Sequence, residues 1–228
     1  MRADGAPRAA ALDLVIFDCD GVLVDSERIA NTEFARMLAE LGLNFTLEQM
    51  FEHFVGRSMA TCMQQVQELL GHAPPPDFEA RLRACTEQAL RRDLSAVRGV
   101  REALAAIALP YCVASGGDHA KMRLTLGITG LLPLFEGRLY SVTEVARGKP
   151  APDVFLHAAR CMGAQPARTA VVEDSVTGVQ AAVAAGMRVF GYAALGEPSR
   201  LARAGAIVFS DMAELPGLLQ RECSAVSC

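Results

Sequence analysis

The hydrophobic and polar positions along the chain form two kinds of pattern. Short apolar runs without polar alternation, typical of strands buried on both faces of a parallel sheet, alternate with helical periodicity in the second half of the sequence. One further run of this kind lies near the N-terminus. The predicted strands span residues 14–17, 111–115, 138–141, 169–172, 187–192 and 206–209. Alternating strands and helices predict an α/β fold with a doubly wound, Rossmann-like parallel sheet.

The stretch from 26 to 95 does not show this alternation. Its apolar residues recur at helical spacing, and Thr46 with Gln49 forms the pattern of a helix capping box. No strand is indicated there. An all-helical insertion directly after the first strand predicts a cap domain at 26–95 on a core domain formed by 1–25 and 96–228.

Composition and charge exclude several classes of protein. The 228 residues are 51% hydrophobic, enough to bury a full core, and the net charge of -4 gives no basic face for nucleic acid. There is no polybasic block for a membrane surface, and no apolar run reaches the ~20 residues of a membrane helix. The first ten residues lack the apolar core of a signal peptide, and the seven scattered cysteines are typical of a reduced protein. We expect a cytoplasmic monomer or weak dimer without nucleic-acid or membrane partners.

Polar side chains with catalytic potential follow the predicted strands or lie in the loops beyond them. These residues are Asp18, Asp20, Ser115, Lys149, Glu173 and Asp174. Because parallel strands of an α/β sheet place their carboxyl ends at one edge, we expect these side chains to converge. Carboxylates suit Mg²⁺, while a hydroxyl and an ammonium group suit the oxygens of a phosphoryl group. One carboxylate can act as nucleophile and another as acid and base.

Asp18 and Asp20 flank a single residue, so strand geometry would point their side chains the same way. Two aligned carboxylates repel each other unless a cation or a shared proton offsets them. Gly21 then permits a sharp turn. Taken alone, this stretch is also compatible with an ordinary Asp-rich turn. Only Lys121 and Lys149 of the 22 basic residues are lysine, so each lysine calls for a separate explanation.

Four segments together resemble the signature motifs of the haloacid dehalogenase superfamily. They are FDCDGVLVDS, the strand end at Ser115, GKPAPD and VVEDSVTG, and they occur in the order found in that family. The resemblance covers residues 12–215. The helical insertion resembles the cap of the phosphoglucomutase-like and phosphoglycolate phosphatase-like branches. VASGGDHAKM, LHAARCMG and VVEDSVTGVQAAVAAGM are similar to sugar-acid phosphatases of the 6-phosphogluconate type.

The resemblance implies a role for each acidic residue. Asp18 would attack phosphorus and form an aspartyl-phosphate, and Asp20 would protonate the leaving oxygen and later activate water. Mg²⁺ would be held by Asp18, by the backbone carbonyl of Asp20 and by Asp174. Glu173 would support the metal as a further ligand or as a holder of water.

The resemblance also implies roles for the residues around the substrate. Ser115 and Gly116 would bind the phosphate, and Lys149 would neutralise both the nucleophile and the phosphate. In the cap, Arg57 is the residue expected to meet the rest of the substrate. A solvated arginine at a helix end is the alternative explanation for Arg57.

Departures from the family patterns favour hydrolysis of a phosphate ester. A dehalogenase lacks the second acid of the first motif, so Asp20 argues against dehalogenation. The mutase branch carries a histidine five residues after the position of Asp25, where this chain has Ala30, and a cap arginine where this chain aligns Met59. We expect a Mg²⁺-dependent phosphatase acting on a small sugar or sugar-acid phosphate. A β-phosphoglucomutase-type mutase and a non-catalytic binding protein on the same fold are the alternatives.

Overall fold

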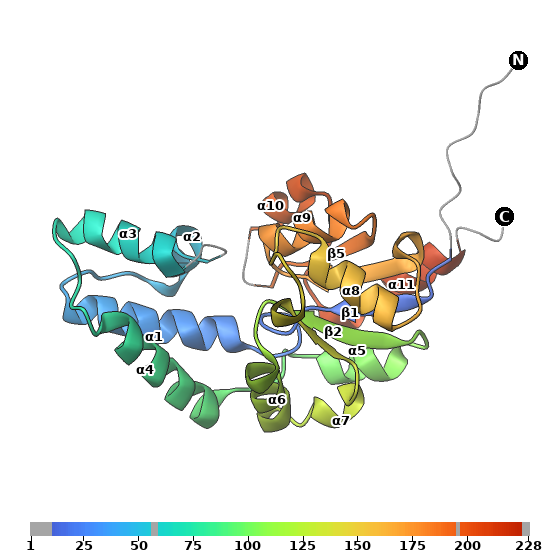
Figure 1. The fold of residues 1–228 in the computed structure, drawn as a ribbon, viewed down its shortest axis with the longest axis horizontal. Coiled ribbons are helices and arrows are strands. Elements are labelled where there is room, and N and C mark those ends of the chain that lie inside the picture. Colours follow the sequence, from blue (N-terminus) through green and yellow to red (C-terminus); the bar gives the residue numbers. More distant parts are fainter. Residues whose placement is uncertain (1–10, 56–58, 195–196, 225–228) are drawn as a thin grey trace, which may run out of the picture.

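The computed structural model describes residues 11–55, 59–194 and 197–224 (Figure 1). Six strands form one sheet, all neighbouring pairs are parallel, and their order is β3-β2-β1-β4-β5-β6. The strands are β1 (Leu14–Phe17), β2 (Tyr111–Ser115), β3 (Leu139–Ser141), β4 (Thr169–Glu173), β5 (Arg188–Tyr192) and β6 (Ile207–Phe209). The α/β fold predicted from the sequence is confirmed.

Helices cover both faces of the sheet because alternate residues of each strand point to opposite sides. In β1, Val15 and Phe17 belong to one buried cluster, while Leu14 and Ile16 belong to the other. The first cluster is completed by α5 (Val100–Ala106), α6 (His119–Ile128), α7 (Leu132–Phe135) and α11 (Leu215–Ser224). The second is completed by α8 (Asp153–Cys161), α9 (Val176–Ala184) and α10 (Pro198–Ala204). Short 3-10 turns occur at η1 (Val142–Glu144), η2 (Pro166–Arg168) and η3 (Met212–Glu214).

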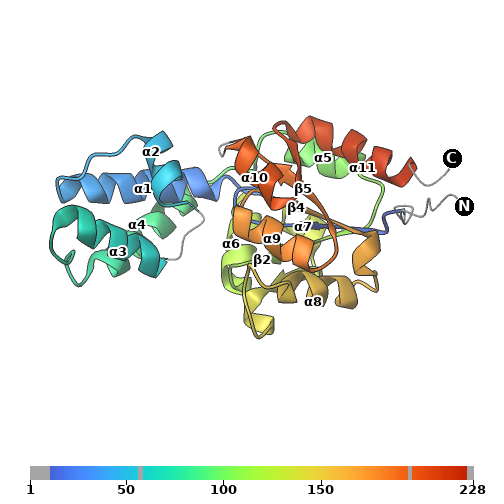
Figure 2. The same ribbon diagram turned by 90° about the horizontal axis from the view of Figure 1, so that it is seen from above.

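In the described residues between β1 and α5, four helices form a separate helical block beside the sheet (Figures 1 and 2). They are α1 (Ser26–Glu40), α2 (Leu47–His53), α3 (Met59–Leu70) and α4 (Phe78–Asp93). This block has its own apolar cluster, in which the ring of Phe34 lies 4.9 Å from that of Phe54 and 6.3 Å from that of Phe78. The predicted capping box of Thr46 and Gln49 is confirmed at the start of α2.

Two neighbouring segments connect the helical block to the core. The backbone N–H of Asp25 donates to the carbonyl of Ser95, and the backbone N–H of Val97 donates to the carbonyl of Leu23. Both hydrogen bonds have a donor–acceptor distance of 3.0 Å. The outgoing and returning chains therefore run side by side next to the end of β1. Within the described residues, no helix has the length and apolar character needed to cross a membrane.

Candidate active site

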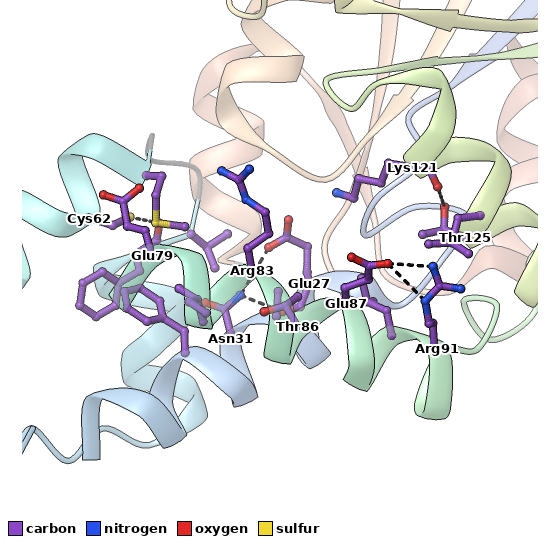
Figure 3. A pocket seen from close by; sticks show the side chains of 18 of the residues that line it. Glu27, Asn31, Cys62, Glu79, Arg83, Thr86, Glu87, Arg91, Lys121 and Thr125 are labelled. Carbon is purple, nitrogen blue, oxygen red and sulfur yellow. Dashed lines mark hydrogen bonds and ion pairs between the residues drawn. The ribbon is translucent and has the colours of Figure 1, made fainter. Parts of the chain in front are cut away.

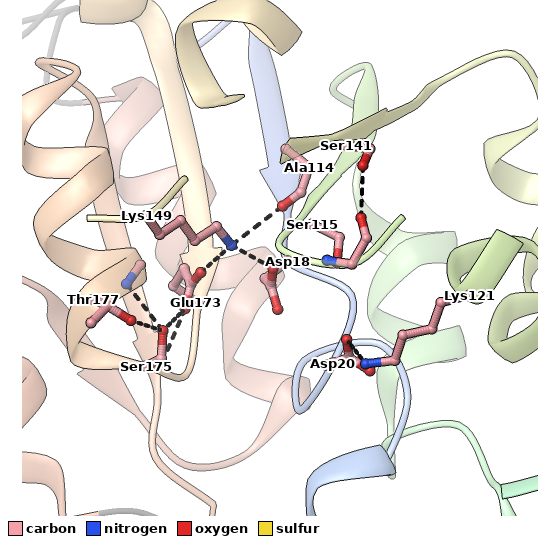
Figure 4. Close-up of polar contacts among 12 residues, drawn as sticks. Asp18, Asp20, Ala114, Ser115, Lys121, Ser141, Lys149, Glu173, Ser175 and Thr177 are labelled. Atoms are coloured by element: carbon pink, nitrogen blue, oxygen red, sulfur yellow. Dashed lines mark hydrogen bonds and ion pairs between the residues drawn. The ribbon is translucent and has the colours of Figure 1, made fainter. Parts of the chain in front are cut away.

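Lys149 brings together two acidic residues from neighbouring strand ends (Figure 4). It lies in the loop before α8, and its Nζ donates to Oδ1 of Asp18 at 2.5 Å and to Oε1 of Glu173 at 2.6 Å. Asp18 follows β1, and Glu173 is the last residue of β4, which pairs directly with β1. The carbonyl of Ala114 is a third acceptor, at 3.4 Å. The predicted convergence of Asp18, Lys149 and Glu173 at this edge of the sheet is present in the structure.

Burial dominates the electrostatics of this group. Burial raises the pKa of the Asp18 carboxyl; the Lys149 ammonium opposes this shift, whereas the Glu173 and Asp20 carboxylates add to it. Burial alone would lower the pKa of Lys149, but Asp18 and Glu173 reverse that effect and raise it. Lys149 therefore stays charged, and it offsets two acids that would otherwise repel each other.

Asp20 has a different set of partners from Asp18. The hydroxyl of Ser26 donates to Oδ1 of Asp20 at 2.6 Å, and Lys121 Nζ donates to Oδ2 at 2.7 Å. The sequence predicted that the carboxylates of Asp18 and Asp20 would point the same way, but Figure 4 shows them directed to different lysines. The difference arises because β1 ends at Phe17, so strand geometry does not extend to either aspartate. Both lysines of the chain thus end on an aspartate of the first motif.

Asp174 approaches the turn after Asp20 through a position that must be glycine. Gly21 has a φ of 76°, and a Cβ placed on it would lie 1.9 Å from Oδ2 of Asp174. The Asp174 carboxylate therefore lies directly against the Gly21 backbone. Burial, together with repulsion from Glu173 and Asp18, raises the pKa of Asp174 well above its usual range. Among the described residues, no group donates a hydrogen bond to this carboxylate.

Glu173 is fixed on both of its oxygens. Besides Oε1, which accepts from Lys149, its Oε2 accepts from the backbone N–H of Ser175 at 3.0 Å and from the Ser175 hydroxyl at 2.9 Å. The Ser175 side chain in turn accepts from the N–H of Gly178 and caps α9. A Cβ on Gly178 would lie 1.8 Å from Oε1 of Glu173, so this approach also requires glycine. The role of Glu173 at a metal stays a prediction, and its carboxylate is directed to Lys149 and Ser175.

Ser115 and Gly116 lie where β2 ends, on the other side of β1 from Glu173. Oγ of Ser115 is buried and accepts from the N–H of Gly117 at 3.0 Å, which leaves its own O–H to donate elsewhere. Gly116 is exposed, and nothing lies within 4 Å of the position a Cβ would take. The hydroxyl of Ser141 donates to the Gly117 carbonyl at 2.8 Å and steadies this turn. The predicted phosphate-binding residues therefore sit at the expected strand end.

The donor set at this edge fits Mg²⁺ by its chemistry. Within the described ranges, no three His, Cys, Asp or Glu side chains are arranged so that they could hold a metal ion by themselves. Mg²⁺, however, needs only one or two protein carboxylates, with water and substrate oxygens as its other ligands. Among the described residues, no group donates a hydrogen bond to Oδ2 of Asp18 or to either carboxylate oxygen of Asp174. With the backbone carbonyl of Asp20, these residues could hold the cation.

A cleft of about 700 Å³ lies between the helical block and the core (Figure 3). Residues of α1 and α4, among them Glu27, Asn31 and Arg83, line it on one side, and residues around the start of α6 line it on the other. Lys121, which contacts Asp20, is one of the α6 residues. Asp20 itself does not line the cleft, so Lys121 is the link between the cleft and the site.

The site differs from the predicted set of residues at Arg57 and at Lys121. Arg57, predicted to contact the substrate from the cap, lies outside the described residues. Lys121 was given no role from the sequence, although its rarity as one of two lysines was a signal. The contact between Lys121 and Asp20 joins residues 101 positions apart, and spacing along the chain does not reveal it.

Comparisons with known proteins show the family of this chain and agree with its fold. The model of the haloacid dehalogenase-like hydrolase family matches residues 12–186, and the chain belongs to this family. A 6-phosphogluconate phosphatase of Escherichia coli (strain K12) is 32% identical over 210 residues, which is 91% of this chain and 94% of that protein. A β-phosphoglucomutase of Mycobacterium bovis is 40% identical over 124 residues, covering 50% of this chain and 46% of that protein.

Solved structures show the same architecture over nearly the whole chain. A haloacid dehalogenase-like protein of Agrobacterium tumefaciens is 37% identical with a TM-score of 0.89, covering 92% of this chain and 99% of its own. A haloacid dehalogenase family hydrolase of Deinococcus radiodurans, solved with bound phosphate and sodium, is 33% identical with a TM-score of 0.84; the match covers 93% of this chain and 97% of that one. The chain is an enzyme of the hydrolase class, and its phosphatase relatives support a phosphoric monoester hydrolase.

Proposed function

We propose that this chain is a Mg²⁺-dependent phosphatase that hydrolyses a small sugar or sugar-acid phosphate through an aspartyl-phosphate at Asp18. The observation that carries this proposal is the position of Asp18. It is buried after the central strand β1, with Oδ1 held by Lys149 and Oδ2 without a donor among the described residues. A carboxylate fixed in this way keeps one oxygen for attack on phosphorus. The Escherichia coli 6-phosphogluconate phosphatase supports a phosphorylated sugar acid or sugar as the substrate class.

In the first step, one carboxylate oxygen of Asp18 attacks the phosphorus and the bond from phosphorus to the sugar oxygen breaks. Protonated Asp20 gives its proton to that oxygen, and the dephosphorylated sugar leaves. In the second step, Asp20 removes a proton from water, whose oxygen attacks the phosphorus and releases phosphate from Asp18. Ser26 and Lys121 hold Asp20 next to the nucleophile for both proton transfers.

The phosphoryl oxygens would be bound by groups from separate segments at this edge of the sheet. Lys149 lies beside Asp18 and offers positive charge, while Ser115 and Gly116 offer hydrogen bonds from the end of β2. Mg²⁺, held by Asp18, Asp174 and the carbonyl of Asp20, would neutralise the remaining charge of the phosphoryl group.

The helical insertion at 26–95 would act as a cap domain over the core formed by 1–25 and 96–228. Phosphate is common to all substrates of this kind, so groups of the cap must distinguish one sugar from another. The paired links at Leu23–Val97 and Asp25–Ser95 are short enough to serve as a hinge through which the cap opens and closes. Arg57 remains a predicted substrate contact.

A phosphate-release screen over phosphorylated metabolites, with Mg²⁺ and with excess chelator, tests this function. We expect release from sugar or sugar-acid phosphates with Mg²⁺ and none with chelator. Asp174→Asn should require a higher Mg²⁺ concentration while keeping the melting temperature near that of the wild type. Full activity in excess chelator would contradict the proposed metal, and no release from any phosphomonoester would contradict the function.

The mutase alternative is favoured by the likeness to the Mycobacterium bovis β-phosphoglucomutase. Ala30 speaks against it, because this position lines the cleft and carries no group that could serve a second phosphate. Incubation with a hexose 1-phosphate separates the two functions. A mutase would yield the isomeric hexose phosphate, whereas the proposed phosphatase would yield free phosphate.

A further inference from the structure

Arg83 on α4 lines the cleft, and its guanidinium group has no hydrogen-bond or ion-pair partner in the described part of the chain. Carboxylates four residues away in either direction, Glu79 and Glu87, are the usual ion-pair partners on a helix. Glu87 is bound by Arg91 at 2.7 Å, and Glu79 forms no ion pair with Arg83. Among the described residues, no oxygen accepts a hydrogen bond from the Arg83 guanidinium. Figure 3 shows its side chain extending away from α4.

Lys121 enters the same cleft from the core. Its backbone is fixed at the start of α6, where its N–H donates to Oδ1 of Asp118 at 2.7 Å. Its ammonium group has three hydrogens, of which one is used by Asp20, and 46% of the side chain is exposed. Arg83 from the helical block and Lys121 from the core thus both line the cleft, on opposite sides.

We propose that Arg83 and Lys121 select a substrate with a second negatively charged group, a carboxylate at the end remote from the phosphate. This inference rests on the proposed phosphatase function, and it concerns the specificity of the same site. Lys121 lines the cleft and also contacts Asp20, which lies two residues after the nucleophile Asp18, so a leaving group that departs past Asp20 on the side of Lys121 would enter the cleft. The remote end of the substrate then meets Arg83, whose planar fork matches a carboxylate.

The other charges of the cleft favour a carboxylate over a second phosphate. Glu27 and Glu79 also line the cleft, and neither forms an ion pair with a cation of the described chain. They would repel a doubly charged phosphate more strongly than a singly charged carboxylate. Glu27, held by the amide of Asn31, can instead accept hydrogen bonds from the hydroxyls of a sugar chain. A polyhydroxy carboxylic acid bearing one phosphate matches this set.

The test compares two substrates that differ only in the remote group. D-gluconate 6-phosphate carries a carboxylate where D-glucitol 6-phosphate carries a neutral hydroxymethyl group. We expect the wild-type kcat/KM to favour the acid by at least about 10-fold, and Arg83→Gln to remove most of that preference through a loss on the acid alone. Lys121→Gln should reduce the preference as well, together with a general loss because Asp20 loses a partner. The control is Arg81→Gln, because Arg81 lies on the same helix but pairs with Glu40 and does not line the cleft.

Each outcome decides a different question. If p-nitrophenyl phosphate is hydrolysed but the acid is not preferred, or Arg83→Gln keeps the preference, the carboxylate site is wrong and the phosphatase function stands. Equal changes in kcat/KM caused by Arg83→Gln and Arg81→Gln on both substrates would likewise overturn the proposed carboxylate site at Arg83. A preference for fructose 1,6-bisphosphate over the sugar acid would show that the cleft selects a second phosphate, and it would overturn the proposed selection of a carboxylate. Failure to hydrolyse any phosphomonoester, p-nitrophenyl phosphate included, would overturn the proposed function itself.

Discussion

Lys121 places its ammonium nitrogen 2.7 Å from Oδ2 of Asp20, although 101 positions separate the two residues in the sequence. Lys149 stands in the same relation to Asp18, at 2.5 Å. Asp18 and Asp20 therefore each have a lysine of their own. The two lysines differ in burial, because the Lys149 side chain is 11% exposed and that of Lys121 is 46% exposed. We expect Lys149 to matter for both folding and activity, and Lys121 chiefly for activity.

Replacing Lys149 by Met should destabilise the protein, because it leaves Asp18 and Glu173 buried without their cation. Breaking a buried ion pair in this way typically costs about 3–5 kcal/mol of unfolding free energy. The pKa of Asp18 is already raised by burial, and it rises further without Lys149. The folded variant then binds protons more readily than its unfolded chain. Lowering the pH should therefore reduce the difference in unfolding free energy between the variant and the wild type.

Urea unfolding of Lys149→Met and the wild type in metal-free buffer, at neutral and at mildly acidic pH, measures this effect. Lys149→Arg is the matched variant, since it keeps the charge but replaces a compact ammonium by a planar fork. It should recover part of the stability while kcat stays at least about 100-fold below that of the wild type. A Lys149→Met protein as stable as the wild type at neutral pH would contradict the structural role.

Gly21 offers a sharp test of the geometry around Asp174. Gly21→Ala adds a Cβ that would lie 1.9 Å from Oδ2 of Asp174, so the turn or the carboxylate must move. We expect kcat/KM for p-nitrophenyl phosphate to fall at least about 100-fold, with a higher Mg²⁺ requirement, because misplaced catalytic groups lose such factors. Gly42→Ala is the control, since Gly42 also has a positive φ, of 86°, but nothing lies within 4 Å of its added Cβ. Comparable losses in both variants would show that backbone strain alone is responsible.

Asp20→Asn should slow hydrolysis according to the leaving group. A sugar alkoxide needs a proton as it departs, so loss of the acid should lower kcat by ~10²–10⁴-fold. p-Nitrophenolate leaves without help, and its release should fall much less, until the water step becomes limiting. Single-turnover rates on the two substrates separate these steps. Equal losses on both would indicate that Asp20 acts mainly through its contacts with Ser26 and Lys121 rather than as an acid.

Much of the core could be predicted because its strands are short, apolar and buried on both faces. The strand patterns at 14–17 and 111–115 match β1 and β2 residue for residue. Helix α11 was not among the predicted elements, and Pro216 and Gly217 in its first turn have low helix propensity. There the packing of Leu215 and Leu219 against the core outweighs local propensity.

The site could be predicted as a set of residues but not as a set of contacts. The carboxyl ends of parallel strands place Asp18, Ser115 and Glu173 together whatever their side-chain directions. Which lysine meets which aspartate depends on the turn after β1 and on the start of α6. Both depend on tertiary packing, which the hydrophobic periodicity of the sequence and the spacing of its motifs do not reveal. Arg83 was missed for the same reason, because its surroundings arise only when α4 folds beside the core.

The most direct test of the proposed function asks whether phosphate becomes attached to Asp18 during turnover. Wild-type enzyme is mixed with Mg²⁺ and a radiolabelled phosphate ester, quenched in acid, and analysed for protein-bound label. We expect label that survives acid, is released by hydroxylamine and maps to the peptide containing Asp18, and none in Asp18→Asn. Phosphate release by the wild type without such label, together with turnover by Asp18→Asn, would contradict the central role of Asp18.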